Sequence, residues 1–373
     1  MSYRTIVGPG KILIATVLML FLSGWHHPVK AHETDQFTVP NQPLADIGPE
    51  VTQEVIRRIQ KIMDELNTDM NANPVRSADD ARLNPETLAK RLQISFGTNP
   101  FQTEFEGWIL KNRFEAQPAH FYVKYNDSVF SGCAVARPLM ALALSPTINI
   151  NGVYLGLDKM GHFVQQGHQY YERYMNVINK DDALRIDALQ AAIRHGISQE
   201  NGIYGSFTIG VYSNADMAAN YAGMHFYLNL TQPVSLGGRI YEPILEIHEG
   251  RWRFKDGQPA PDLFTRFITN HLNEAMNPPV LTGDIRGIYE KNVRKLSSRW
   301  VMFYESSARQ EEQRLGTLSR WFGEPYGYAG PENIISIASV HVDEETPQTA
   351  AVSPAEPEPV STSVVSVNHS PGM

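Results

Sequence analysis

The chain has 373 residues, of which 42% are hydrophobic, a formal net charge of −8 at pH 7 and a single cysteine. Its length and hydrophobic content allow a substantial buried core, in one large domain or in two closely packed lobes. The acidic balance leaves no broad basic surface for nucleic acid, and one cysteine excludes an intramolecular disulfide and a thiolate zinc cluster.

The N-terminus has the pattern of a secretory signal peptide. Basic residues precede an apolar run over residues 12–22, and the Val-Lys-Ala triplet that ends at Ala31 suits signal-peptidase cleavage before His32. The run is shorter than the ~20 residues of a membrane-spanning helix. We therefore expect cleavage of residues 1–31 and a periplasmic or secreted mature chain without a transmembrane span.

The two ends of the mature chain differ in composition from its middle. Residues 32–46 contain two prolines and little periodicity, and we expect an extended leader on the surface. A single globular domain is expected over residues 47–342. Residues 343–373 are rich in Pro, Ser, Thr, Val and Glu, which predicts a disordered tail.

Helical patterns dominate the middle of the chain. Apolar residues recur at helical spacing from Pro49 to Met70, where the proline suits a first turn. Asp158 is expected to cap the central helix, and Gly196 to stop the helix that follows it. The expected helices span residues 49–70, 85–93, 103–111, 137–143, 158–178, 181–195, 261–276 and 284–306.

Two β-hairpins interrupt this helical pattern. Residues 147–155 place two β-rich arms around Asn151-Gly152, a pair that favours a type I′ turn. Residues 244–254 have the same form with a longer, charged turn. The predicted fold is therefore mainly α (α+β), with a helical core, two hairpins and a disordered C-terminal tail.

A polar stripe follows the central helix. Asp158, His162, Gln165 and Gln169 are spaced at i, i+4, i+7 and i+11, so that a carboxylate, an imidazole and two amides share one helical face. An ordinary core helix would carry apolar residues there. The stripe therefore marks a candidate site.

A second stripe, in residues 210–223, carries Asp216 and Asn220 among alanines and glycines. Small residues let helix backbones approach each other, and the central helix also has Gly161 and Gly167. We expect the two helices to pack together, which would bring the two polar stripes within reach of each other.

Three interpretations of this constellation remain open. In the first, Asp158, His162 and Asp216 bind a divalent metal such as zinc, which activates water. In the second, Asp216 or Asp158 orients His162 as a general base. In the third, His162 donates to Asp216, Asp158 caps its helix and Asn220 bonds a loop carbonyl, in a network that fixes helix register without catalysis.

Other polar residues have weaker patterns. Arg137 could pair with a carboxylate at the site, bind an anionic substrate or form an ordinary ion pair elsewhere. Cys133 is expected to be a small buried hydrophobe. His168 lies about 120° around a regular helix from His162, so we expect it outside the ligand face.

The segments Gly156-Leu157-Asp158-Lys159-Met160-Gly161-His162-Phe163 and Ala215-Asp216-Met217-Ala218-Ala219-Asn220 carry a resemblance. With them the chain resembles a family of uncharacterised secreted or periplasmic bacterial proteins that have Asp-Lys-x-Gly-His-Phe and Ala-Asp-x-x-Ala-Asn motifs. The Asp-Lys-x-x-His core is also similar to motifs in VanZ-like and small periplasmic lipoprotein families, whose membrane spans and lipobox this chain lacks. The resemblance implies a location outside the cytoplasm and no particular reaction.

Two functions are therefore expected as alternatives. One is a metal-assisted or His-based hydrolase that acts on a cell-envelope substrate, with His162, Asp216 and Asp158 as catalytic residues. The other is a noncatalytic envelope binding or scaffolding protein, in which the same cluster is structural. The candidate binding residues in the first case are Asn220, Gln165, Gln169 and Arg137.

Overall fold

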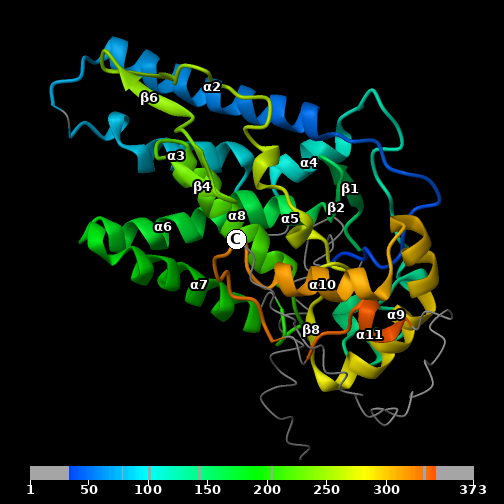
Figure 1. Ribbon diagram of the computed structural model, residues 1–373. Coiled ribbons are helices and arrows are strands. Elements are labelled where there is room, and N and C mark those ends of the chain that lie inside the picture. Colours follow the sequence, from blue (N-terminus) through cyan, green and yellow to red (C-terminus); the bar gives the residue numbers. More distant parts are fainter. Residues whose placement is uncertain are drawn as a thin grey trace, which may run out of the picture. The chain divides into compact units, whose positions relative to one another are not determined.

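The computed structural model describes residues 33–77, 79–99, 102–141, 144–202, 205–330 and 333–341. The predicted signal peptide and C-terminal tail lie outside these residues. The described chain is mainly helical, with small two-stranded sheets between and beside the helices (Figure 1), so the predicted mainly α (α+β) class is confirmed. Within this part of the chain, no helix combines the length and the apolar composition needed to cross a membrane.

The helices are short to medium in length, and one π-helical segment joins two of them. The π segment, η5, covers His162–Gln166 between α5 and α6. The α-helices are α2 (Gly48–Ala72), α3 (Pro85–Phe96), α4 (Glu104–Lys111), α5 (Asp158–Gly161), α6 (Gly167–Ile178), α7 (Arg185–Asn201), α8 (Asn214–Asn229), α9 (Gly283–Tyr304), α10 (Ala308–Leu318) and α11 (Ile337–Val340).

Helix starts follow capping signals in the sequence. The Asn84 side chain accepts a hydrogen bond from the Glu86 backbone at the start of α3, immediately before Pro85. At α4, Thr103 and Glu106 form a capping box in which each side chain bonds the backbone of the other. These local bonds replace the partners that the first turn of a helix lacks.

Both predicted hairpins are confirmed. Strands β1 (Thr147–Ile150) and β2 (Val153–Gly156) pair antiparallel, and Asn151 and Gly152 between them have φ values of 55° and 78°, as a type I′ turn requires. Strands β6 (Leu245–His248) and β7 (Arg251–Phe254) form the second hairpin.

Two further strand pairs were not predicted. Strands β4 (Val234–Leu236) and β5 (Arg239–Tyr241) pair around a Gly-Gly turn in which both glycines have positive φ. Strands β3 (Val211–Tyr212) and β8 (Val280–Leu281) pair over two residues each. Such short strands leave too little alternation in the sequence to be recognised.

The predicted helix over residues 261–276 is wrong. That segment contains only the 3₁₀ turns Thr265–Phe267 and Asn270–Leu272. The Asn273 side chain accepts hydrogen bonds from the backbone N–H groups of Ala275 and Met276, at 2.9 and 3.0 Å, and so competes with helical bonding.

Two other helix predictions also need correction. The segment predicted as a helix over residues 137–143 holds a 3₁₀ turn at Pro138–Ala141. Helix α7 continues past Gly196, which therefore does not stop it. A side chain at Gly196 would collide with the Tyr170 ring, so this glycine serves the packing of α7 against α6.

The first part of the N-terminal leader is buried, which contradicts its expected surface position there, whereas residues 41–43 and Asp46 are exposed as expected. The five residues from Glu33 to Phe37 are each at most 5% exposed. Thr34 forms a parallel bridge with Ser145, and Asp46 forms another with Asn149. The leader is therefore an integral part of the fold, although its composition resembles that of a surface segment.

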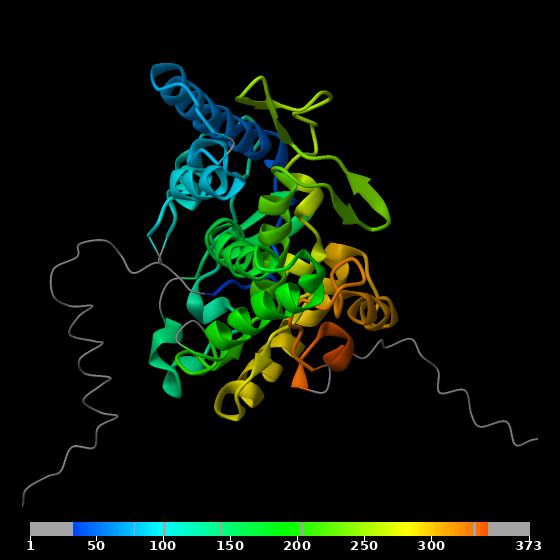
Figure 2. The same cartoon turned by 90° about the vertical axis from the view of Figure 1, so that its left-hand side faces the viewer.

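The expected packing of the two motif helices is confirmed. Helix α8 contacts both η5 and α6, and every residue of α8 is buried. A Cβ atom added at Gly167 would lie 2.7 Å from the Gly223 Cα atom, and one at Gly223 would collide with the Phe163 carbonyl. The green helices, α6 and α8 among them, lie side by side in Figure 1 and remain so when the view is turned by 90° (Figure 2).

We predict that Gly223→Ala lowers the free energy of unfolding by about 2 kcal/mol or more, because the added methyl group must push two backbones apart. The matched control is Gly287→Ala in α9, where an added Cβ atom meets nothing within 4 Å. That control should stabilise the chain by roughly 0.5 kcal/mol, because alanine favours helix. Urea unfolding measures both, and equal effects would contradict the close helix contact.

Candidate functional site

The ammonium group of Lys159 lies where the two motif helices meet. Its Nζ atom lies 2.8 Å from Asp158 Oδ2, 2.5 Å from Asp216 Oδ1 and 2.6 Å from Glu274 Oε1. The Lys159 side chain is 0% exposed, and none of the three carboxylates is more than 9% exposed. The ammonium thus lies within ion-pair distance of three carboxylate oxygens, and it donates a hydrogen bond to that of Asp158.

These contacts determine the charge of the lysine. Burial alone would lower the pKa of Lys159, but Asp158, Asp216 and Glu274 together raise it well above its usual value. Lys159 is therefore a permanent cation at neutral pH.

The capping of the first turn of α8 holds Asp216 next to the Lys159 ammonium. Ser213 caps this helix by accepting a hydrogen bond from the Asp216 N–H at 2.9 Å, and its own hydroxyl donates to Glu274 Oε1 at 2.6 Å. Although burial opposes ionisation, His162 and Lys159 lower the pKa of Asp216 below its usual value. Its position in the first helical turn also favours the carboxylate.

Glu274 comes from the loop that replaces the predicted helix over residues 261–276. Its backbone N–H donates to Gln36 Oε1 at 3.0 Å, which ties the loop to the N-terminal leader. Burial raises the pKa of Glu274 to about 7, against the lowering effect of Lys159. The loop conformation therefore brings a titratable acid to the ammonium.

Two more buried acids adjoin this group. Glu33 is 5% exposed and Glu200 is 2% exposed. Burial, followed by the charges of Glu274 and Asp216, raises the pKa of Glu33 well above its usual value, and burial and Asp216 do the same for Glu200. We call the five acids Glu33, Asp158, Glu200, Asp216 and Glu274, together with Lys159, the buried cluster.

His162 lies at the edge of the buried cluster. Its Nε2 atom is 3.3 Å from Asp216 Oδ2, and its Nδ1 atom is 3.1 Å from Asn220 Oδ1. Asn220 in turn donates to Gln166 Oε1 at 3.2 Å, which orients its oxygen towards the imidazole. The His162 side chain is 14% exposed, so the ring closes the cluster on its outer side.

Gln166, which lies in the π segment η5, is the glutamine that joins this network. In a regular helix both Gln165 and Gln166, at i+3 and i+4 from His162, would lie beside it, and the structure shows the bond from Asn220 to Gln166. Gln169, also expected in the site, accepts a hydrogen bond from His195 Nε2 at 3.1 Å as that ring is oriented. The network beside His162 thus includes Gln166, and Gln169 bonds His195 instead, while binding roles for Gln165 and Gln169 stay predictions.

Arg137 is also outside the buried cluster. Its guanidinium lies 2.7 Å from Asp284 Oδ2 and donates to the Phe207 carbonyl at 3.1 Å. Of the predicted alternatives, the ordinary ion pair is the one that the structure shows. His168, as expected, does not face His162 and packs edge-on against Tyr227.

Asp158 does not cap its helix as predicted. Leu157 occupies the N-cap position, and the Asp158 N–H donates to the Ser145 hydroxyl at 3.2 Å. Its side chain turns instead towards Lys159, its neighbour in the sequence. The predicted contact between His162 and Asp216 is confirmed, whereas Asn220 bonds His162 and Gln166 and not a loop carbonyl.

The side chains do not suit the metal site expected at Asp158, His162 and Asp216. Among the described residues, no group of three or more His, Cys, Asp or Glu side chains is arranged to hold a metal ion. The Lys159 ammonium lies between Asp158 and Asp216, in the place that a divalent cation would need. Repulsion between two cations opposes metal binding there.

Some of the residues that sequence reasoning missed lie within the two motif segments, and the others come from elsewhere in the chain. Lys159 stood within the motif, and its position beside Asp158 in an apolar stretch was a usable signal. The others depend on tertiary structure that the sequence pattern did not reveal. The missed residues are Lys159, Ser213, Gln166, Glu33, Glu200 and Glu274.

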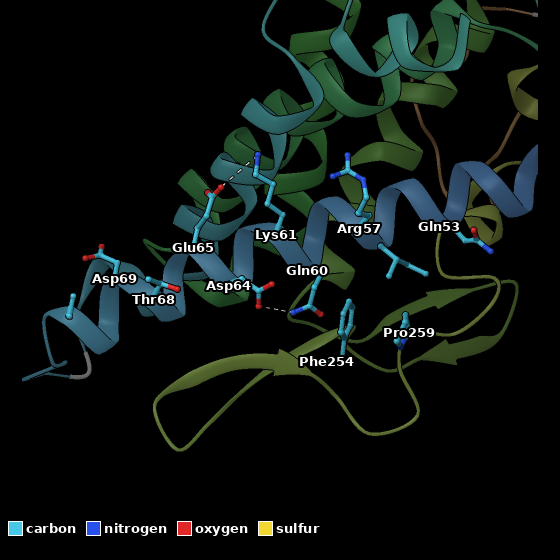
Figure 3. Close-up of a pocket in the computed structure, with 12 residues that line it drawn as sticks. Gln53, Arg57, Gln60, Lys61, Asp64, Glu65, Thr68, Asp69, Phe254 and Pro259 are labelled. Atoms are coloured by element: carbon cyan, nitrogen blue, oxygen red, sulfur yellow. Dashed lines mark hydrogen bonds and ion pairs between the residues drawn. The ribbon is translucent and has the colours of Figure 1, made fainter. Parts of the chain in front are cut away.

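A groove of about 1050 Å³ lies elsewhere, between α2 and the loop after β7 (Figure 3). Gln53, Arg57, Gln60 and Asp64 line it from the helix, and Phe254 faces them. None of the residues of the buried cluster contributes to its lining. The groove and the buried cluster are therefore separate features.

Comparison with known proteins assigns no relative. No protein-family model, curated protein or solved structure matches the chain. Its function must be argued from its own side chains.

We predict that Glu200→Gln removes a pH-dependent loss of stability. The folded pKa of Glu200 is raised, so the protonated acid contributes stability that is complete below its unfolded pKa and is lost as the pH rises through the folded pKa. The amide introduced by the substitution cannot ionise. As the pH rises above the unfolded pKa of the acid, the variant should become progressively more stable relative to wild type, by at most about 1.4 kcal/mol per pH unit, measured by urea unfolding between pH 5 and pH 8.

The matched control for this experiment is Glu115→Gln, because Glu115 is exposed. That variant should keep a constant difference from wild type at every pH. Asp216, whose pKa is lowered, makes stability rise with pH, but it does so in wild type and in both variants, so its effect cancels when they are compared. A Glu200→Gln difference that does not change with pH would contradict a protonated Glu200 in the folded chain.

Proposed function

We propose that the chain is a noncatalytic binding or scaffolding protein of the cell envelope, in which the buried cluster and His162 hold the helical core together. The observation that carries the proposal is the fully buried Lys159 ammonium, which takes a carboxylate from α5, α8 and the Glu274 loop at once. A buried ion network of this kind requires all its segments to be in place together, because each unpaired charge is costly.

The bonds of His162 support the same conclusion. A general base needs a ring nitrogen with a free lone pair that points at substrate. Both ring nitrogens of His162 instead face oxygen atoms, one of Asp216 and one of Asn220. Ser213, three residues before Asp216, is fully buried and occupied as a helix cap.

The location in the envelope rests on the N-terminal sequence. The apolar run over residues 12–22 and the triplet that ends at Ala31 are typical of exported proteins. The Asp-Lys-x-Gly-His-Phe motif at Asp158 resembles that of secreted and periplasmic bacterial proteins. Both observations support an envelope ligand as the binding partner.

A His-based hydrolase is the second candidate. The observation in its favour is the pair of His162 and the buried Asp216, which is the arrangement that orients a catalytic imidazole. It requires that substrate displace Asn220 from His162 Nδ1 and enter where the ring is 14% exposed.

One experiment distinguishes the two. The mature chain is incubated with the isolated envelope fraction of the source cell, bound protein is measured by co-sedimentation, and released products are measured by mass spectrometry. The proposal predicts saturable binding and no released products above background with either wild type or His162→Gln. His248→Gln is the matched control, since His248 is 53% exposed on β6.

Products that wild type releases and His162→Gln does not would establish the hydrolase and overturn the proposal. Absence of saturable binding by the wild-type chain would also overturn the proposal.

A further inference from the structure

A polar cleft of about 550 Å³ lies among α3, α6 and α7. Glu86 lines it from α3 and His195 lines it from α7, and the other described lining residues share one face of α6 at i, i+3, i+4 and i+7. These are Gln169, Glu172, Arg173 and Asn176. Every described side chain in the lining is thus polar or charged, so the cleft has the volume of a small-molecule site but suits a hydrophilic ligand.

The two acids of the polar cleft are each held from one side. Glu86 Oε1 accepts a hydrogen bond from Asn179 Nδ2 at 2.7 Å, and Glu172 Oε1 lies 3.5 Å from Lys90 Nζ. Neither Oε2 atom accepts a hydrogen bond from a described residue. Each carboxylate is therefore oriented and keeps one oxygen for a ligand.

Gln169 and His195 orient each other in the same way. His195 Nε2 donates to Gln169 Oε1 at 3.1 Å, which leaves the Gln169 amide N–H groups as donors and His195 Nδ1 as an acceptor. Burial, followed by the charge of Arg173, lowers the pKa of His195, so the ring is mainly neutral at pH 7. The pair adds hydrogen-bonding groups to the cleft without adding charge.

Arg173 supplies the positive charge of the polar cleft. Its side chain is exposed at the rim, and it forms no ion pair or hydrogen bond with a described residue. A guanidinium group binds a carboxylate through two parallel hydrogen bonds, which makes arginine the preferred residue for this anion. The cleft thus combines an anion-binding group with two carboxylates that bind an ammonium.

This set of charges limits the class of ligand. A ligand that fills the cleft removes the lining charges from water, so each charge needs a partner on the ligand. A neutral molecule or a simple amine would leave Arg173 without a counter-charge, and a simple anion would leave Glu86 and Glu172 without one. A molecule with both an ammonium and a carboxylate satisfies all three.

We propose that the polar cleft binds a short peptide by its two free ends, with the terminal carboxylate on Arg173 and the terminal ammonium between Glu86 and Glu172. The volume of the cleft exceeds that of a single amino acid. The amides of Gln169 and Asn176 match the N–H and C=O groups of a peptide backbone. The proposal rests on the binding part of the proposed function and gives that function a site and a ligand class.

Isothermal titration calorimetry of the mature chain at pH 7, with trialanine as the probe, tests the proposal. Wild type should bind one trialanine per chain in a saturable manner. N-acetyl-trialanine lacks the ammonium and trialanine amide lacks the carboxylate, so each should bind about tenfold more weakly or worse.

Substitutions assign each end of the peptide to its partner. Arg173→Met should weaken trialanine binding by about tenfold and abolish the preference for trialanine over its amide. Glu86→Gln with Glu172→Gln should abolish the preference for trialanine over its N-acetyl form. Arg194→Met is the matched control and should bind as wild type does, because Arg194 is exposed on α7 outside the cleft lining.

Two outcomes would overturn the proposal. One is the absence of saturable trialanine binding by wild type, or equal binding of trialanine and its two blocked forms. The other is saturable binding of maltotriose that Arg173→Met leaves unchanged, which would assign the cleft to a neutral sugar.

Co-sedimentation with the envelope fraction separates this proposal from the proposed function. Arg173→Met should weaken envelope binding by about tenfold, whereas Arg194→Met should not change it. Envelope binding that Arg173→Met leaves intact would overturn the polar cleft as the binding site and leave the proposed function standing. Absence of envelope binding by wild type would overturn the proposed function itself.

Discussion

The burial of the Lys159 ammonium is the constraint on which the rest of the structure depends. A charge with 0% exposure is tolerable only if its partners arrive together, and here they come from α5, α8 and the Glu274 loop. The leader joins them through the bond from Glu274 N–H to Gln36. Segments that are far apart in the sequence are thereby linked through the Lys159 ammonium and its carboxylate partners.

The packing of α6 against α8 also supports the polar network around Lys159. Gly167 and Gly223 let α6 and α8 approach at backbone distance, which places Asp216 and Asn220 opposite His162. The π segment then aligns Gln166 with Asn220 and completes the outer side of the network. The close packing at the glycines, the π segment and the polar network thus form one arrangement. Each of the three depends on the other two.

Much of this architecture could be predicted from local patterns. The helical periodicity of α2, the Asn151-Gly152 turn and the small residues of α8 each act over a short range, and each prediction from them is confirmed. The contact between His162 and Asp216 followed from helical spacing and helix packing. What local patterns could not reveal is the path of irregular segments, since Glu33 and Glu274 reach the buried cluster through loop and leader conformations that have no period.

The most direct test of this account is the stability of Lys159→Met beside Lys90→Met. Lys90 is 51% exposed and lies 3.5 Å from Glu172, so its loss should cost at most about 1 kcal/mol. Lys159→Met leaves three buried carboxylates without their cation and should lower the free energy of unfolding at pH 7 by about 3–5 kcal/mol. Equal, small effects of the two substitutions would contradict the claim that the buried ammonium holds the fold together.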